Sequence, residues 1–310
     1  MRVTFLGTGV FAVPSLEALL AAGHEIAAVV CQPDRPRGRG LELTPPPVKM
    51  AATAAGLPIL QPRRIKEPEV DGQLRELRPE AQVVVAYGQI LPRRVIDIAP
   101  LGTVNVHGSL LPRWRGAAPI QWAIASGDTR TGVTTMLIDE GLDTGPILDA
   151  VETGIEPEER APELESRLSV LGAELLCRTL DGLGGGALES RSQDSALATH
   201  ARILEKQDGA IDWSVPASRI LCRLRGFDPW PGAFTTFGGR LLKVLRAREV
   251  TASSGPVGTV SGVDRAGISV FCGDGTRLLL EEVQPESRRP MSAHSFALGT
   301  RVATGVDLSR

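Results

Sequence analysis

The sequence is poor in the features that mark disulfide-stabilised, metal-binding or membrane-spanning proteins. It contains four cysteines in 310 residues, without a C-x-x-C pair or a dense cluster. We therefore expect reduced thiols and no metal site. No apolar run approaches the roughly 20 residues that a transmembrane helix needs. The N-terminus has the pattern of a buried strand and lacks an export-signal cleavage site, so we expect a cytoplasmic protein with no membrane partner.

Composition and length bound the architecture. The chain is 42% hydrophobic and 23% charged, which is ordinary for a globular protein, and it is long enough for two domains. Its formal net charge is −2, but residues 207–310 contain 13 basic and 10 acidic side chains. This mildly basic C-terminal part is compatible with nucleic-acid contact without demonstrating it.

The strongest local signal is an amide and an imidazole two positions apart, Asn105 and His107, at the end of an apolar stretch. In an extended chain alternate side chains share one face, so we expect the two to point the same way. Gly108 and the following proline end the strand, which places the pair at its carboxyl end, where open α/β sheets bind ligands. Asp143 lies in a short loop bracketed by glycines, and we expect it to approach His107.

These three residue types suit an acyl transfer. An asparagine amide can stabilise a developing oxyanion, and a histidine can move a proton near neutral pH. A carboxylate beside the ring orients it and favours its cationic form. Because no G-x-S-x-G motif is present, we predict direct attack by an incoming nucleophile on a site formed by Asn105, His107 and Asp143. Taken singly, Asn105 could instead cap a turn, His107 could be a buried core histidine, and Asp143 could be an ordinary turn residue.

Two longer segments carry a family resemblance. The stretch His107–Ile120 (HGSLLPRWRGAAPI) and the stretch Gly141–Gly145 (GLDTG) resemble the signature segments of the folate-dependent formyltransferases. The resemblance implies 10-formyltetrahydrofolate as formyl donor and the α-amine of methionine on initiator tRNA as acceptor. It also implies that a turn after the strand contacts the folate; the turn consists of Ser109, Leu110, Leu111 and Pro112.

An arginine-rich stretch between residues 32 and 47 predicts a cationic surface loop. Arg35, Arg37 and Arg39 alternate with Gly and Pro, which disfavours a helix or a buried strand. Such a loop is usually only solvated, but arginines can also hold phosphates through bidentate contacts. The resemblance implies an insertion that contacts the tRNA acceptor stem, with Arg39 matching its best-known arginine. It also places a linker lysine at Lys206.

Two enzymatic alternatives remain open, while a third alternative, a non-catalytic RNA-binding protein with a degenerate enzyme domain, is disfavoured by the intact Asn105, His107 and Asp143. The turn Gly7–Ala12 matches the G-x-G-x-x-A fingerprint of dinucleotide-binding proteins, and Asp34 follows where a ribose-binding acid could lie. A nicotinamide-dependent oxidoreductase is therefore one alternative, although in the resembling family this turn closes strand to helix without a cofactor. The other alternative is a folate-dependent formyltransferase for a small amine, such as an amino-sugar nucleotide or a purine precursor.

The pattern along the chain predicts a two-domain α/β protein. Residues 1–186 contain apolar strands separated by helices, which predicts a Rossmann-like, mostly parallel sheet with helices on both faces. The polar residues 187–206 suit a linker. Residues 207–310 contain short strands separated by Gly- or Asp-rich turns, which predicts a small β-domain, and the resemblance favours an OB-like β-barrel that binds tRNA. We expect a monomer.

Overall fold

The computed structural model describes residues 1–37, 41–251 and 253–308. Two compact units share the chain, and each takes segments from more than one part of the sequence. The N-terminal unit comprises Met1–Pro119, Arg130–Gly154 and Glu163–Ala201. The C-terminal unit comprises the remaining segments, Ile120–Thr129, Ile155–Pro162 and Arg202–Arg310.

The N-terminal unit is built around one seven-stranded sheet. Its strands are β1 (Arg2–Gly7), β2 (Glu25–Val30), β5 (Ile59–Leu60), β6 (Ala81–Val85), β7 (Thr103–His107), β9 (Arg130–Leu137) and β10 (Ile147–Gly154). They lie in the order β10-β9-β7-β6-β1-β2-β5. The five strands from β7 to β5 are parallel. At the other end, β9 pairs antiparallel with β7, and β10 pairs antiparallel with β9. The expected Rossmann-like, mostly parallel sheet is confirmed.

The helices of this unit begin where the sequence allows it. They are α1 (Val13–Ala21), α2 (Pro47–Ala54), α3 (Pro68–Glu76), α4 (Arg93–Ile96) and α6 (Ala161–Gly184), with the 3-10 turns η1 (Val10–Ala12) and η2 (Ser195–Leu197). Proline stands in the first turn of α1, α2 and α3, where a missing N–H costs no helical hydrogen bond.

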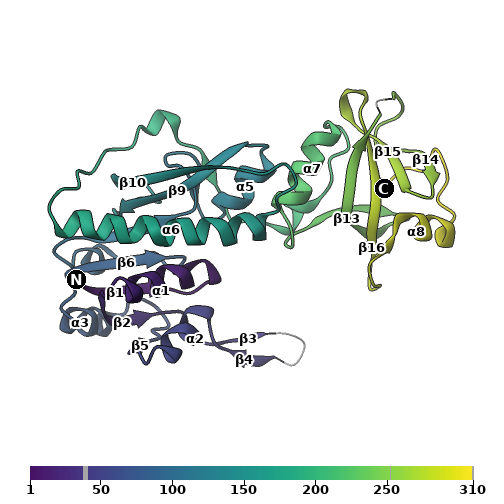
Figure 1. Ribbon diagram of the computed structural model, residues 1–310. Helices are drawn as coiled ribbons and strands as arrows, with labels where there is room; N and C mark the ends of the chain where they lie inside the picture. Colours follow the sequence, from purple (N-terminus) through teal and green to yellow (C-terminus); the bar gives the residue numbers. More distant parts are fainter. Residues whose placement is uncertain (38–40, 252, 309–310) are drawn as a thin grey trace. The chain divides into compact units, whose positions relative to one another are not determined.

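The long helix α6 lies along the sheet beside β9 and β10 (Figure 1). Its leucines 164, 168, 175, 176 and 180 are buried, and they recur at helical spacing, which places them on one packed face of the helix. The approach is closest at Gly172, because a Cβ there would lie 2.9 Å from Val106 Cγ1 of β7 and 3.3 Å from Val133 Cγ1 of β9. Helix α6 therefore covers the face of β7 that carries Val106, and residues of alternate parity lie on the other face.

The arginine-rich stretch differs from the expected irregular loop. It forms a hairpin of β3 (Arg35–Arg37) and β4 (Glu42–Thr44), paired antiparallel, which extends outward from α2 in Figure 1. The prediction of surface exposure is right for Arg35 and for the tip-side residues Leu41 and Leu43, which are 71% and 70% exposed. Proline is tolerated in so short an isolated pair because an edge position needs no N–H on its open side.

The C-terminal unit is an antiparallel β-domain with added helices. Its strands are β12 (Ala233–Phe237), β13 (Arg240–Val250), β14 (Val260–Asp264), β15 (Gly267–Phe271), β16 (Arg277–Pro285) and β17 (Met291–Ser292). The order is β12-β13-β16-β15-β14, and β17 pairs with β16. The helices are α5 (Pro119–Ala125), α7 (Ala217–Gly226) and α8 (Ala293–Thr300), with the 3-10 turns η3 (Lys206–Gly209) and η4 (Gly273–Gly275). The expected C-terminal β-domain is confirmed.

Helix α5 packs within this second unit, although it is close in sequence to β7. Gly226 of α7 permits the contact, since a Cβ there would lie 2.6 Å from Ala125 N and 2.7 Å from Gln121 O. The rings of Trp122 and Phe227 meet edge to face at 5.4 Å, an arrangement that aromatic pairs prefer.

The polar stretch 187–206, expected as a linker, is divided between the units at Ala201. Its first part is tied to the N-terminal unit by backbone pairing, because β11 (His200–Ala201) runs parallel to β8 (Arg115–Gly116). In the residues that the structure describes, no helix is both long and apolar enough to cross a membrane.

Candidate active site

The end of β7 brings together the residues that the sequence singled out. In the register between β7 and β9, Asn105 lies opposite Met136 and His107 opposite Thr134, so the two share the face that α6 does not cover. His107 is only 6% exposed, and Asn105 is partly exposed. The loop that follows β9 carries Asp143 to the same place.

Asp143 lies between the two β7 side chains. Its Oδ1 is 3.5 Å from Asn105 Nδ2, and its Oδ2 is 3.7 Å from His107 Nδ1. The same Oδ2 accepts a hydrogen bond of 2.8 Å from the backbone N–H of Gly116. Hydrogen bonds of normal strength span about 2.7–3.2 Å. The carboxylate is therefore fixed by Gly116, while Asn105 Nδ2 and His107 Nδ1 make only long contacts with it and remain available to a reacting atom.

The loop that carries Asp143 depends on its two glycines. A Cβ on Gly145 would lie 1.8 Å from Leu137 O, and one on Gly141 would lie 2.0 Å from Thr144 Oγ1. Asp143 itself has φ +53°, a left-handed conformation that aspartate adopts more readily than most residues. Such strained backbone persists where the surroundings hold it, which is common at functional sites.

The other ring nitrogen of His107 is occupied. Nε2 lies 2.9 Å from the carbonyl oxygen of Trp114. Because a carbonyl can only accept, Nε2 carries the proton of this bond, and Nδ1 is the nitrogen that faces Asp143. Trp114 has φ +61°, an outlier for a bulky side chain. The segment after Pro112 is thus bent so that its carbonyl holds the histidine ring.

The turn expected to contact folate is rigid. Ser109 is fully buried, and its hydroxyl donates to Arg113 O at 2.6 Å. Thr134 of β9 donates to Ser109 O at 2.7 Å and accepts from the N–H of Leu111 at 3.1 Å. The Ser109 hydroxyl is therefore engaged inside the turn. The partly exposed side chains are those of Leu110 and Pro112.

The residues expected to contact tRNA fall in both units. Arg35 is exposed and donates to Gln32 Oε1 at 3.3 Å in the N-terminal unit. Arg37 lies in β3. Arg39 lies outside the described residues. Lys206 is exposed at the start of η3 in the C-terminal unit.

The turn of the dinucleotide alternative is filled by the chain's own contacts. The hydroxyl of Thr8 donates to Tyr87 O at 2.9 Å and accepts from the N–H of Gln32 at 3.3 Å, which ties the ends of β1, β2 and β6 together. Asp34 accepts from Gln61 at 2.9 Å and from Lys49 at 2.8 Å. These two bonds, that of Gln61 first, hold the pKa of Asp34 below its ordinary value. The acid expected to bind a ribose is therefore already paired.

The two buried cysteines, Cys31 and Cys272, do not offer a nucleophile. Burial raises the pKa of the Cys31 thiol to about 11 and that of Cys272 to about 12. Since the thiolate is the reactive form, these groups are inert near neutral pH. Among the described residues, no group of three or more His, Cys, Asp or Glu is placed to hold a metal ion.

The residues that hold the three side chains in place were not predicted from the sequence. Trp114 and Gly116 contact His107 and Asp143 through backbone atoms, and Gln193 contacts the Asp143 loop from the stretch expected as a linker. Backbone contacts leave no mark on residue type. Gly116 has a φ of +120°, a conformation that favours glycine. This positive φ is the one feature that the residue type could have indicated.

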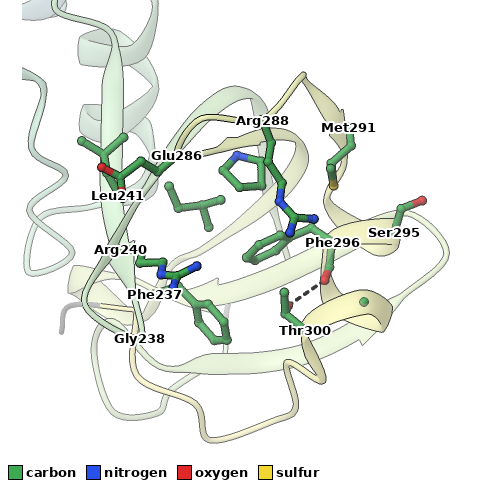
Figure 2. A pocket seen from close by; sticks show the side chains of 13 residues that line it. Phe237, Gly238, Arg240, Leu241, Glu286, Arg288, Met291, Ser295, Phe296 and Thr300 are labelled. Carbon is green, nitrogen blue, oxygen red and sulfur yellow. Dashed lines mark hydrogen bonds between the residues drawn. The ribbon is translucent and has the colours of Figure 1, made fainter.

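The C-terminal unit has a pocket of its own. Its volume is about 640 Å³, and it is lined by β13, the loop after β16, and α8. Figure 2 shows the side chains of Arg240 and Arg288 directed toward this pocket, near the rings of Phe237 and Phe296. The two rings meet edge to face at 5.5 Å. Guanidinium groups beside aromatic rings suit a ligand with phosphates and bases.

The fold and the site together define an α/β group-transfer protein with an added β-domain. The chain matches the family described as "Formyl transferase" over residues 1–180 and that described as "Formyl transferase, C-terminal domain" over residues 203–301. It therefore belongs to the formyl transferase family, and the resemblance inferred from residues 107–120 and 141–145 is confirmed. It is 53% identical over 303 residues to a methionyl-tRNA formyltransferase of Solibacter usitatus, covering 97% of this chain and 96% of that one. It is 48% identical over 308 residues to the methionyl-tRNA formyltransferase of Geotalea daltonii, covering 99% and 98%.

Solved structures share the fold at much lower identity. An N-formyltransferase from Helicobacter canadensis, in complex with folinic acid and dTDP-3-aminofucose, superposes with a TM-score of 0.66 at 15% identity, covering 92% of this chain and 99% of that one. HypX from Aquifex aeolicus, in complex with tetrahydrofolic acid, gives 0.64 at 15% identity and covers 96% of this chain and 47% of that one. The fold thus occurs in proteins that bind folates.

Proposed function

We propose that the chain transfers the formyl group of 10-formyltetrahydrofolate to the α-amino group of methionine esterified to initiator tRNA. The observation that carries this proposal is the convergence of Asn105, His107 and Asp143 at the end of β7. Relatives that are 46–53% identical over nearly the full length are methionyl-tRNA formyltransferases, which supports this acceptor. Proteins of the same fold bind folates, which supports the donor.

The chemistry follows from the three side chains. An α-amine has a pKa near 8, and an adjacent ester lowers it, so a neutral nucleophile is available at neutral pH. The amine attacks the formyl carbon, and the formyl oxygen becomes an oxyanion. Asn105 Nδ2 donates to this oxygen. His107 donates to it through Nδ1 in its cationic form, because its Nε2–H is bonded to Trp114 O. Asp143 keeps the ring in place and accepts the proton that leaves the amine. The oxyanion then collapses, the bond between the formyl carbon and N10 of the folate breaks, and N10 takes up the proton from Asp143 as tetrahydrofolate leaves.

The folate is expected to lie against the turn Ser109–Pro112. Because the hydroxyl of Ser109 is bonded to Arg113 O, the turn offers backbone groups and the side chains of Leu110 and Pro112 for this contact. Leu111 is 7% exposed and supports the turn from within. The hydrogen bonds to Thr134 fix the turn before a ligand arrives, which reduces the entropy lost on binding.

The acceptor RNA is expected to meet the arginines of the β3–β4 hairpin and Lys206. Arg35 and Lys206 are exposed cations that can neutralise phosphates, and Arg37 and Arg39 continue the hairpin series in the sequence. The fold is shared with an N-formyltransferase solved with a dTDP-sugar, but at 15% identity. The small-amine alternative is therefore supported at the level of fold only.

A competition of acceptors tests the proposal. Purified protein with 10-formyltetrahydrofolate should formylate methionyl-initiator tRNA and leave free methionine, an amino-sugar nucleotide and a purine-precursor amine unformylated at equal concentration. Preferential formylation of one of the small amines would refute the tRNA assignment. A mixture without folate but with a nicotinamide nucleotide is the negative control for the oxidoreductase alternative. We expect no formylated product in this mixture.

A further inference from the structure

The segment 191–201, which we call the strap, is bonded to both loops of the candidate active site. At its beginning, the backbones of Arg191 and Ile147 exchange two hydrogen bonds of 2.7 Å beside the Asp143 loop. At its end, Thr199 O accepts from the N–H of Arg115 at 2.9 Å, and Ala201 O accepts from the N–H of Ala117 at 2.8 Å. The strap therefore joins two loops that are separated in sequence.

One side chain of the strap holds the Asp143 loop directly. The amide nitrogen of Gln193 donates to Asp143 O at 2.9 Å and to Gly145 O at 2.7 Å. Its amide oxygen accepts from Arg115 Nε at 3.0 Å and from Arg115 Nη2 at 2.8 Å. The orientation of the amide is unambiguous, because carbonyl groups only accept and a guanidinium only donates. Gln193 thus satisfies four bonds with one planar group.

Arg115 connects Gln193 to the residues that hold His107. Arg115 is 5% exposed, and its neighbours in sequence are Trp114, which holds His107 Nε2, and Gly116, which holds Asp143 Oδ2. The N–H of Trp114 in turn donates to Thr199 Oγ1 of the strap at 2.8 Å. A shift of Gln193 would therefore disturb the Asp143 loop on one side and the residues that hold His107 on the other.

We propose that Gln193 is a positioning residue that sets the distance between Asp143 and the side chains of Asn105 and His107 on β7. This role rests on the proposed formyl transfer. It touches no reacting atom. Its amide donates to the backbone on both sides of Thr144 and so fixes a loop whose central aspartate has a left-handed backbone. Two strained residues, Asp143 and Trp114, are kept in place by the strap, which supplies the restraint that such backbone needs.

The variant Gln193→Glu removes the hydrogen-bond donor of the amide and keeps its acceptor. A carboxylate keeps the acceptor for Arg115 but cannot donate to Asp143 O and Gly145 O, and it repels both carbonyls. We expect kcat to fall by about 100-fold, the size of effect that a displacement of about 1 Å produces, with the KM values for folate and tRNA little changed. Acidification should raise the activity of this variant relative to wild type, because a protonated carboxyl group can donate again.

Gln193→Met provides the contrast, since it keeps similar length without any hydrogen bond and should lose activity at every pH alike. Arg191→Ala, an exposed side chain on the same strap, is the matched control and should behave as wild type. Hydrogen exchange of the amides of residues 139–145 supplies a readout apart from catalysis. Exchange should be faster in both Gln193 variants and unchanged in Arg191→Ala.

The outcomes separate this inference from the proposed function. Wild-type kcat in Gln193→Glu, or unchanged exchange at residues 139–145 in both Gln193 variants, would overturn the role of Gln193. An identical pH dependence of Gln193→Glu and Gln193→Met would do the same. Absence of formyl transfer by the wild-type chain would instead refute the proposed function, while the exchange experiment would still report whether Gln193 fixes the loop.

Discussion

Two loops of the N-terminal unit show opposite ways of presenting a charged side chain. The Asp143 loop is held on all sides. Gly116 bonds the carboxylate, Gln193 bonds the backbone, and Gly145 allows the loop to approach Leu137 O. The side chain of Asp143 is 15% exposed. Its oxygens are thereby fixed before any substrate arrives, in the place where the carboxylate can hold the His107 ring and accept the proton of the amine.

The β3–β4 hairpin presents its charged side chains in the opposite way to the Asp143 loop. Three short backbone pairs join its strands, and Leu41 and Leu43 stand open to solvent. Its base is tied down where Asp34 meets Lys49 and Gln61. A surface that captures a polyanion needs reach and charge more than fixed geometry, because phosphate contacts act over several ångströms. The comparison predicts that substitutions in the first loop lower kcat and those in the second raise KM.

His107→Ala should give the largest effect. It removes one donor to the oxyanion, a loss that lowers turnover by about 100- to 1000-fold. Steady-state kinetics should show this fall in kcat with nearly constant KM values. His294→Ala, on α8 of the C-terminal unit, is the control and should keep full activity. Turnover of His107→Ala close to that of wild type would exclude the histidine from the reaction.

Gly145→Ala tests whether the first loop must be rigid. Its Cβ would lie 1.8 Å from the backbone oxygen of Leu137, so the loop has to move. We expect a loss of about 1–3 kcal/mol in the free energy of unfolding and a kcat lower by about 100-fold. Gly72→Ala in α3 meets no atom within 4 Å and should instead stabilise the protein by about 0.5–1 kcal/mol. Equal behaviour of the two variants in thermal unfolding and kinetics would contradict a tightly packed Asp143 loop.

Substitution of the hairpin arginines should act on binding. Replacing Arg35, Arg37 and Arg39 by alanine removes up to three cations that can neutralise phosphates. For each phosphate that is no longer neutralised, the slope of log affinity against log salt should become shallower by about 0.7–0.9. The KM for tRNA should rise steeply while kcat at saturation changes little. Arg64→Ala, an exposed arginine elsewhere in the unit, serves as control. A salt dependence identical to that of wild type would exclude the hairpin from RNA capture.

The anchor at the base of the hairpin should have the smallest effect. Bonds from Gln61 and then Lys49 lower the pKa of Asp34, so its stabilising contribution is present above the ordinary aspartate range and is lost as pH falls through the lowered value. Asp34→Asn should therefore lower the melting temperature slightly near neutral pH, and the difference from wild type should vanish in acid. A difference that grows on acidification would show that the carboxylate is not stabilised in its charged form.

The sheet and the shared orientation of Asn105 and His107 could be predicted from the sequence because both depend on local periodicity. Apolar runs such as 81–85 become buried parallel strands, and the spacing of Asn105 and His107 places them on one face. The role of Gln193 could not be predicted, since it depends on contacts with residues about fifty positions away in the chain. A polar segment has the same composition whether it is a free linker or a strap.

The hairpin and α8 were missed for different reasons. The alternation of Arg, Pro and Gly between residues 35 and 40 gives no strand signal, and β3 and β4 are only three residues long each, too short for a periodic pattern. Helix α8 is only eight residues long, with a serine cap at Ser292 whose hydroxyl accepts from Ser295 N at 3.1 Å. Helices of two turns depend on packing, here of Phe296 in the core of the C-terminal unit, more than on propensity.

The most direct test of the central claim is the rate of a single formyl transfer by Asn105→Ala, measured with enzyme in excess over charged initiator tRNA and with saturating 10-formyltetrahydrofolate. Loss of one loosely held donor should slow this step by about 100- to 1000-fold while folate binding is retained. A single-turnover rate equal to that of wild type would contradict the claim that the β7 pair and Asp143 stabilise the transition state.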